Sequence, residues 1–155
     1  MGEYDSRVDT YKHIQQVQKY LMKCVQELQQ RLLEHDQTKL EDPEKKIFDE
    51  YSPKLEDSTY GSDEYNQFLD EMQEALVHHY AHNDHHPEHF DEGIQGMDLI
   101  QLLELAADWM AATKRHNDGD ILESIEKNQE RFGYGDELKN ILRNTVINYF
   151  DVEDE

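Results

Sequence analysis

The chain has 155 residues, of which 36% are hydrophobic, and this suits a single globular domain with a modest core. Its formal net charge is −21 at pH 7, from 15 lysines and arginines against 36 aspartates and glutamates. This negative charge excludes nucleic-acid binding through phosphate neutralisation and disfavours docking onto anionic membranes.

The cysteine content and the apolar runs indicate the compartment. Cys24 is the only cysteine, so an internal disulfide is excluded and a reducing environment is expected. No apolar run approaches the length of a membrane span, and the N-terminus lacks the basic and apolar segments of a secretory signal. We therefore expect a cytoplasmic protein.

Apolar periodicity predicts an all-α protein, a compact bundle of about six helices. We expect one domain over residues 1–150 and an acidic tail over residues 151–155. The first helix should run from about Arg7 to Leu33, because its apolar residues recur at spacings of three and four. Such a stripe is typical of a buried helix face. Its members are Ile14, Val17, Leu21, Cys24, Val25, Leu28 and Leu32.

A second, shorter helix is predicted after Asp42-Pro43, which combine a capping residue with proline at the first helical position. It should extend through Tyr51 and end at Pro53, and residues 57–61 are expected to form a loop.

Capping residues predict the starts of the remaining helices. Ser62 should cap a third helix whose last turns carry the start of the histidine-rich segment and which ends before Pro87. Asp98 and Gln101 form a capping-box pattern. The later helices are predicted from Leu99 to about Arg115, from Asp120 to about Arg131, and from Asp136 to Phe150.

Histidine is concentrated in one segment, since six of the nine histidines lie between residues 78 and 89. Neutral imidazole is the commonest protein ligand of transition metals. His78 and His82 would share one helix face, as would His79 and Asn83. Pro87 disfavours a helical conformation at His86, so His85 and His86 are expected on a turn beyond the helix. The segment predicts a metal or substrate site.

Two further groups carry suitable chemistry. His35-Asp36 places an imidazole beside a carboxylate at the end of the first helix, with Lys39 three residues later. Asp108 lies beside Trp109 on the apolar border of a later helix. A carboxylate in that setting is either paired with a cation of the protein or bound to a metal ion.

The order His13, His35-Asp36, later histidines and Asp108 resembles the HD-domain superfamily of all-helical, metal-dependent phosphohydrolases. The chain is also similar to an uncharacterised family of small phage and bacterial proteins. The matching motifs are His35-Asp36-x-Thr38-Lys39, His78-His79-x-x-x-Asn83-x-His85-His86 and Glu104-x-x-x-Asp108-Trp109-Met110-x-Ala112.

The HD resemblance implies an HD-like fold that holds one or two divalent metal ions, with Mn, Fe, Co, Ni or Zn expected before Mg. A metal-bound water would attack phosphorus, with Asp36 at the ions and Lys39 steadying the phosphate. The metal ligands would be His13, His35, Asp36, His79, His85, His86 and Asp108. The residues expected to bind substrate are His78, His82, Asn83 and Arg115.

His13 fits this set poorly. If residues 13 to 35 form one helix, their separation is about 33 Å, too far for a shared ion. His13 can join the site only if the helix breaks, for example around Met22 to Glu27, where no glycine or proline occurs.

The leading hypothesis is a metal-dependent phosphohydrolase for a small phosphorylated substrate, in particular a nucleotide. Analogy with HD proteins suggests a homodimer. One alternative is an all-α nucleoside-triphosphate pyrophosphohydrolase, which would use Glu71, Glu74, Glu104 and Asp108 to bind Mg²⁺. The other is a non-catalytic acidic protein that mimics nucleic acid or inhibits a basic partner.

Overall fold

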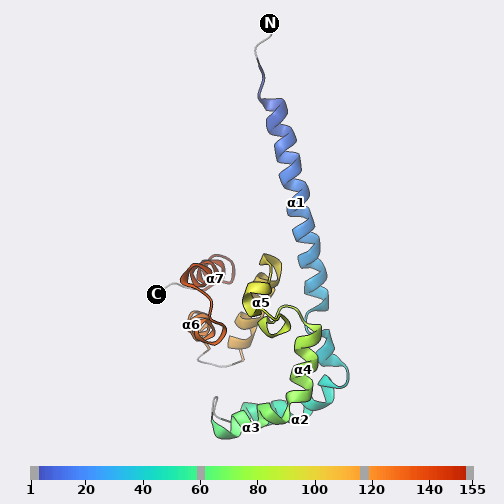
Figure 1. Ribbon diagram of the computed structural model, residues 1–155, viewed down its shortest axis with the longest axis vertical. Helices are drawn as coiled ribbons and strands as arrows, with labels where there is room; N and C mark the ends of the chain where they lie inside the picture. Colours follow the sequence, from blue (N-terminus) through green and yellow to red (C-terminus); the bar gives the residue numbers. More distant parts are fainter. Residues whose placement is uncertain (1–3, 59–61, 116–118, 153–155) are drawn as a thin grey trace. The chain divides into compact units, whose positions relative to one another are not determined.

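The computed structural model is all-α, as the periodicity predicts (Figure 1). It describes residues 4–58, 62–115 and 119–152, and these contain helices and no strand. Contacts divide the chain into two compact units, residues 1–35 and residues 36–155. The α-helices are α1 (Arg7–Glu34), α2 (Glu44–Asp57), α3 (Asp63–Glu71), α4 (Gln73–His82), α5 (Leu99–Thr113), α6 (Ile121–Phe132) and α7 (Asp136–Tyr149). The 3₁₀ segments are η1 (Gln37–Leu40), η2 (Pro87–His89) and η3 (Gly93–Gly96).

The first unit contains α1, a single unbroken helix that ends one residue beyond the predicted end. The negative charge of Asp9 in the first turn and the positive charge of Arg31 in the last turn both interact favourably with the helix dipole. The apolar stripe is correctly placed along α1, but the expectation that it is buried is wrong. No residue of α1 is buried, and Leu21 is 61% exposed. Spacing identifies which residues share a face, whereas burial also requires a partner surface.

The second unit begins with η1 and α2, and α2 extends farther than predicted. Pro53 lies inside the helix, which continues to Asp57. A proline removes one backbone hydrogen-bond donor within a helix, and α2 continues for one turn beyond it. Most of the loop predicted at residues 57–61 lies outside the described residues.

The predicted third helix is divided into α3 and α4, which raises the number of α-helices from the expected six to seven in the described part of the chain. Ser62 caps α3 as predicted, because its side chain accepts a hydrogen bond from the backbone N–H of Tyr65. Met72 separates the two helices with a backbone ψ of 3° and is itself buried. Burial of Met72 and Ala75 anchors α4, which packs against α2, η1 and η2.

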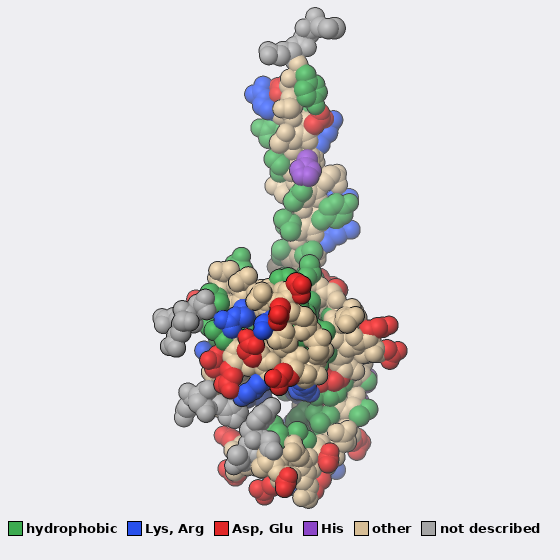
Figure 2. Space-filling model, turned by 60° about the vertical axis from the view of Figure 1, so that its left-hand side comes forward, with side chains coloured by type: hydrophobic (Ala, Val, Ile, Leu, Met, Phe, Trp, Pro, Cys, Tyr) green, Lys and Arg blue, Asp and Glu red, His purple; other side chains and the backbone are tan. Residues whose placement is uncertain are grey.

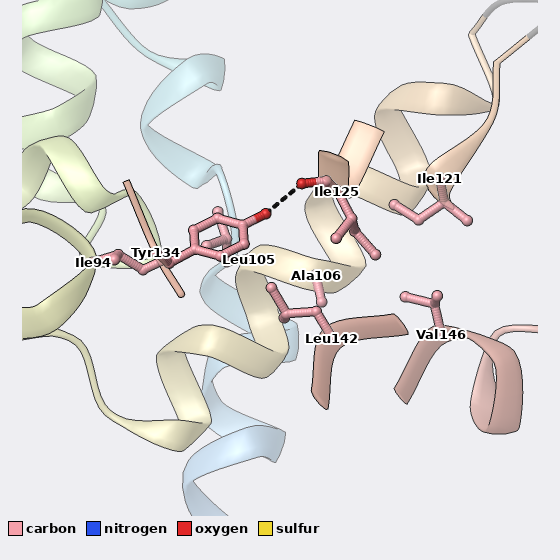
Figure 3. Close-up of a cluster of buried hydrophobic side chains, with 8 residues drawn as sticks. All are labelled: Ile94, Leu105, Ala106, Ile121, Ile125, Tyr134, Leu142 and Val146. Carbon is pink, nitrogen blue, oxygen red and sulfur yellow. Dashed lines mark hydrogen bonds between the residues drawn. The ribbon is translucent and has the colours of Figure 1, made fainter. Parts of the chain in front are cut away.

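The hydrophobic core lies among α5, α6 and α7 (Figure 3). The predicted capping box of Asp98 and Gln101 starts α5, and Asp120 caps α6 through the N–H groups of the next turn. Gly133 ends α6 with a φ of 68°, a left-handed conformation that glycine adopts at little cost. The buried residues of this core are Ile94, Leu105, Ala106, Ile121, Ile125, Tyr134, Leu142 and Val146.

Tyr134 shows how this core accommodates a polar group. Its ring is buried, and its hydroxyl donates a 2.6 Å hydrogen bond to the carbonyl of Ile125 (Figure 3). The core holds α5 in place, and α5 carries two carboxylates of the site described below. None of the helices in the described residues has the length and apolar character of a membrane span.

Candidate metal centre

Asp36, His79, His85 and His86 gather at one point in the second unit. Asp36 immediately precedes η1, with a φ of 56° that aspartate tolerates better than most residues. His79 lies in the last turns of α4. His86 has an extended backbone before Pro87, as predicted, and with His85 it belongs to the turn that follows α4.

The potential ligand atoms of these four residues all lie within 4.8 Å of one another. The Nε2 atoms of His79 and His86 are 2.9 Å apart. Asp36 Oδ1 lies 3.3 Å from His79 Nε2 and 3.5 Å from His85 Nε2. Bonds from a transition metal to nitrogen or oxygen are about 2.0–2.2 Å long, so donors around one ion lie roughly 3–4 Å apart. The cluster therefore has the dimensions of a site for one ion.

A buried and a half-buried carboxylate hold the Nδ1 edges of the His79 and His85 rings. Glu44 is fully buried, and its Oε2 atom lies 2.9 Å from His79 Nδ1. Glu104 Oε1 lies 3.2 Å from His85 Nδ1. An ionised carboxylate only accepts hydrogen bonds, so Nδ1 of each imidazole is the donor and Nε2 keeps its lone pair. Carboxylates hold metal-binding histidines in this way, fixing the tautomer and the ring orientation.

Glu44 is stabilised as an anion. Burial raises the pKa of its carboxyl group, but hydrogen bonds from His78, Thr38 and His79 outweigh burial and lower the pKa overall. Thr38 donates to Glu44 Oε2 at 3.0 Å, and His78 Nδ1 lies 2.7 Å from Glu44 Oε1. Glu44 thus links η1 to two histidines of α4.

His86 is neutral over the physiological pH range. Burial and the adjacent imidazoles of His85 and His79 lower the pKa of His86 to about 3. The charge of Asp108 acts in the opposite direction but is outweighed. An imidazole that stays neutral can offer a lone pair to a metal ion without competition from protons.

Lys39 and Asp108 flank the cluster. The ammonium group of Lys39 lies 2.6 Å from Asp36 Oδ2, on the oxygen that does not face the histidines. Carboxylate oxygens of Asp36 and Asp108 lie within 4.8 Å of each other. Asp36 therefore lies close both to the histidine cluster and to the half-buried Asp108 of α5.

The residues predicted to bind substrate have different surroundings. Asn83 is buried, and its amide donates to Thr38 Oγ1 at 2.9 Å and to the carbonyl of His79 at 2.8 Å. The rings of His78 and His82 stack at 4.1 Å, with His82 exposed. Arg115 is exposed beyond the end of α5. These contacts make Asn83 part of the framework that positions His79.

His13 does not join His35 at one ion within a chain. Because α1 is unbroken, the two residues are separated by about 33 Å along the helix axis. The break suggested around Met22 to Glu27 is absent, in keeping with the lack of glycine or proline there. His35 is the last residue of the first unit and adjoins Asp36 in sequence, and its role as a ligand stays a prediction.

Sequence reasoning missed Glu44 altogether. An acidic residue in the first turn of a helix is usually explained by the helix dipole, so its pattern carried no sign of a contact with histidines 34 and 35 residues away. Glu104 was recognised in a motif but not as the partner of His85. Of the carboxylates in the pyrophosphohydrolase alternative, Glu71 and Glu74 are exposed on α3 and α4, apart from the buried network.

The fold and the site define an all-α protein with a candidate metal centre of three imidazoles and one carboxylate. The chain belongs to a family of unknown function (DUF5662), whose profile matches residues 2–151. No curated protein and no solved structure matches the chain.

Proposed function

We propose that Asp36, His79, His85 and His86 bind a divalent transition-metal ion. One observation carries this proposal: four donor atoms lie within 4.8 Å of one another, while the buried Glu44 and the half-buried Glu104 hold the Nδ1 edges of His79 and His85. Three imidazoles and one carboxylate favour Mn, Fe, Co, Ni or Zn over Mg, which prefers oxygen ligands.

The chemistry that we propose for this centre is the hydrolysis of a small phosphoester, in particular a nucleotide. A metal ion in the cluster would lower the pKa of a bound water and supply the nucleophile. Asp36 is the residue that contacts both the histidines and Lys39, so it would position the ion, while Lys39 would balance the charge of a bound phosphate.

The charges around the centre bear on the number of ions. Four carboxylates, of Asp36, Glu44, Glu104 and Asp108, lie at or beside the centre, and Lys39 is the cation that contacts Asp36. Imidazole binds a metal ion in its neutral form, so the histidines add no charge to the loaded site. With one divalent ion this group keeps a net negative charge, which repels phosphate, whereas a second ion makes it positive. We therefore propose that the form which binds phosphate carries two ions, with Asp36 and Asp108 as candidate ligands of the second.

Metal analysis of untagged protein tests the centre. We expect near-stoichiometric transition metal after reconstitution, and a loss of metal in Asp36→Asn and His86→Ala with the helical content unchanged. His89→Ala is the matched control, because His89 belongs to the same segment but is exposed and contacts the carbonyl of Tyr80. Absence of metal from the reconstituted protein would refute the centre.

A panel of nucleotides and simple phosphoesters then tests the reaction. We expect turnover that rises between one and two equivalents of Mn²⁺ and is lost in Asp36→Asn. If the metal-loaded protein turns over no substrate of the panel, the proposed metal centre stands and the proposed phosphohydrolase activity is refuted.

The distribution of charge favours a second candidate, an acidic protein that binds a basic partner. Five of the 15 basic residues and five of the 36 acidic residues lie in residues 1–35, so residues 36–155 carry the whole net charge of −21. Binding to a basic protein that weakens steeply with salt, without any dependence on metal, would support this candidate.

A further inference from the structure

The first unit presents an apolar stripe with a heptad repeat. Spacings of three and four place Tyr11, Ile14, Gln18, Leu21, Val25, Leu28 and Leu32 on one line along α1, and six of these seven positions are apolar. Lys12, Lys19 and Lys23 fall on the opposite face. Hydrophobic side chains reach the surface along α1 (Figure 2), and Tyr11 is 65% and Leu21 61% exposed.

A largely exposed apolar stripe of this length is unfavourable in water, because most helices in proteins are stabilised by packing of their apolar face. The repeat suits a second helix of the same kind, since a seam of heptad positions packs against a like seam by inserting side chains between those of its partner. The single polar position, Gln18, would lie near the middle of such a pair.

We propose that two copies of the chain associate through antiparallel packing of their α1 helices. The distribution of charge selects the direction. Residues 1–35 carry no net charge, whereas the residues that follow them carry −21. Parallel helices would bring two such segments together, but antiparallel helices separate the two C-terminal ends of α1 by about 42 Å, several times the Debye length of about 8 Å.

The fullest antiparallel overlap places heptad positions of one copy opposite those of the other, with Ile14 facing Val25 and Tyr11 facing Leu28 of the second copy. Burial of an aliphatic side chain removes roughly 60–120 Å² from water, so five such side chains from each copy give an interface on the order of 1,000 Å². This is close to the lower limit of about 1,000 Å² for a specific interface, so the dimer should dissociate on dilution.

Sedimentation of the full chain over a range of concentrations tests the association. We expect a reversible monomer–dimer equilibrium, which Leu21→Glu shifts to monomer by at least about tenfold in Kd, since it buries a charge in the interface. Gln16→Glu adds the same charge on the opposite face of α1 and should leave the equilibrium unchanged. A monomer at every concentration would overturn the proposal, and this is the result expected if α1 packs against its own chain. Equal effects of Leu21→Glu and Gln16→Glu on the equilibrium would overturn it as well.

Disulfide cross-linking tests the direction. In a Cys24→Ser background, chains with Ile14→Cys and chains with Val25→Cys should each stay unlinked alone and form a cross-linked dimer when mixed under mild oxidation. Cross-linking of either variant by itself would indicate parallel helices and overturn the antiparallel arrangement. Because α1 is probed without reference to metal or turnover, the outcome is independent of the proposed hydrolase.

Discussion

The buried carboxylate of Glu44 lies 2.9 Å from Nδ1 of His79, while Nε2 of the same ring lies 3.3 Å from Asp36 Oδ1. One edge of the imidazole is thus held by a fixed anion, and the other is directed into the cluster. Glu44 also receives hydrogen bonds from Thr38 and His78, so its own orientation is set from two elements. The position of His79 therefore depends on a residue that is not itself a candidate ligand.

Glu44→Gln should weaken metal binding without unfolding the protein. The amide has nearly the same shape, but it removes the negative charge that keeps the proton on Nδ1 of His79. Loss of such an outer partner typically costs 10- to 100-fold in metal affinity. Competition titration with a chelating dye measures the change, and Glu41→Gln, an exposed residue near the start of α2, is the control. Unchanged affinity in Glu44→Gln would contradict the role of Glu44.

Asn83→Ala should lower stability by about 1–3 kcal/mol, because it leaves buried polar groups without their partner. Its amide joins Thr38 to the carbonyl of His79 at the end of α4. Chemical denaturation measures the loss, and Asn140→Ala, on the exposed side of α7, should change stability by less than about 0.5 kcal/mol. A variant of unchanged stability that only raises KM would instead support the sequence-based prediction that Asn83 binds substrate.

Local signals in the sequence predicted those parts of the fold that depend on neighbouring residues. Ser62 and the pair Asp98 and Gln101 make their hydrogen bonds within one turn, so capping patterns were sufficient to place α3 and α5. The extended backbone of His86 follows from Pro87 in the same way. These features need no information about the rest of the chain.

The predictions from sequence were wrong or incomplete where the structure depends on packing between distant parts of the chain. Met72 interrupts the predicted third helix although neither glycine nor proline occurs there, and it is one of the most deeply buried residues. The stripe of α1 has the period of a buried helix but no buried residue. The contact between Glu44 and His79 joins residues 35 apart in sequence, and periodicity within single helices cannot reveal it.

The metal-free protein should become less stable as the pH falls from 6.5 towards 5. The pKa of His86 is about 3 in the folded protein, against 6.5 ordinarily, because burial disfavours the charged ring. Between pH 6.5 and 5 the unfolded chain binds a proton on His86 that the folded protein does not bind. The free energy of unfolding therefore decreases as the pH is lowered. The slope from this residue is at most about 1.4 kcal/mol per pH unit.

Chemical denaturation at several pH values, with chelator present, measures this slope. His86→Gln should flatten the dependence between pH 6.5 and 5, since glutamine does not titrate. His82→Gln is the matched control, because His82 is an exposed histidine of the same segment, and it should keep the slope of the parent protein. A parent-like slope in His86→Gln would show that His86 takes up a proton as readily in the folded protein as in the unfolded chain.

Lys39→Met separates metal binding from phosphate chemistry. The ammonium group lies 2.6 Å from Asp36 Oδ2 and competes with a metal ion for the charge of that carboxylate. Removing it should tighten metal binding by up to about fivefold, which corresponds to the roughly 1 kcal/mol of a partly exposed ion pair. If Lys39 also stabilises the charge on phosphate, kcat should fall by about 10²-fold at saturating metal. Lys45→Met, at an exposed lysine of α2, should change neither quantity. Tighter metal binding with unchanged kcat would show that Lys39 balances the charge of Asp36 and does not stabilise the charge on phosphate.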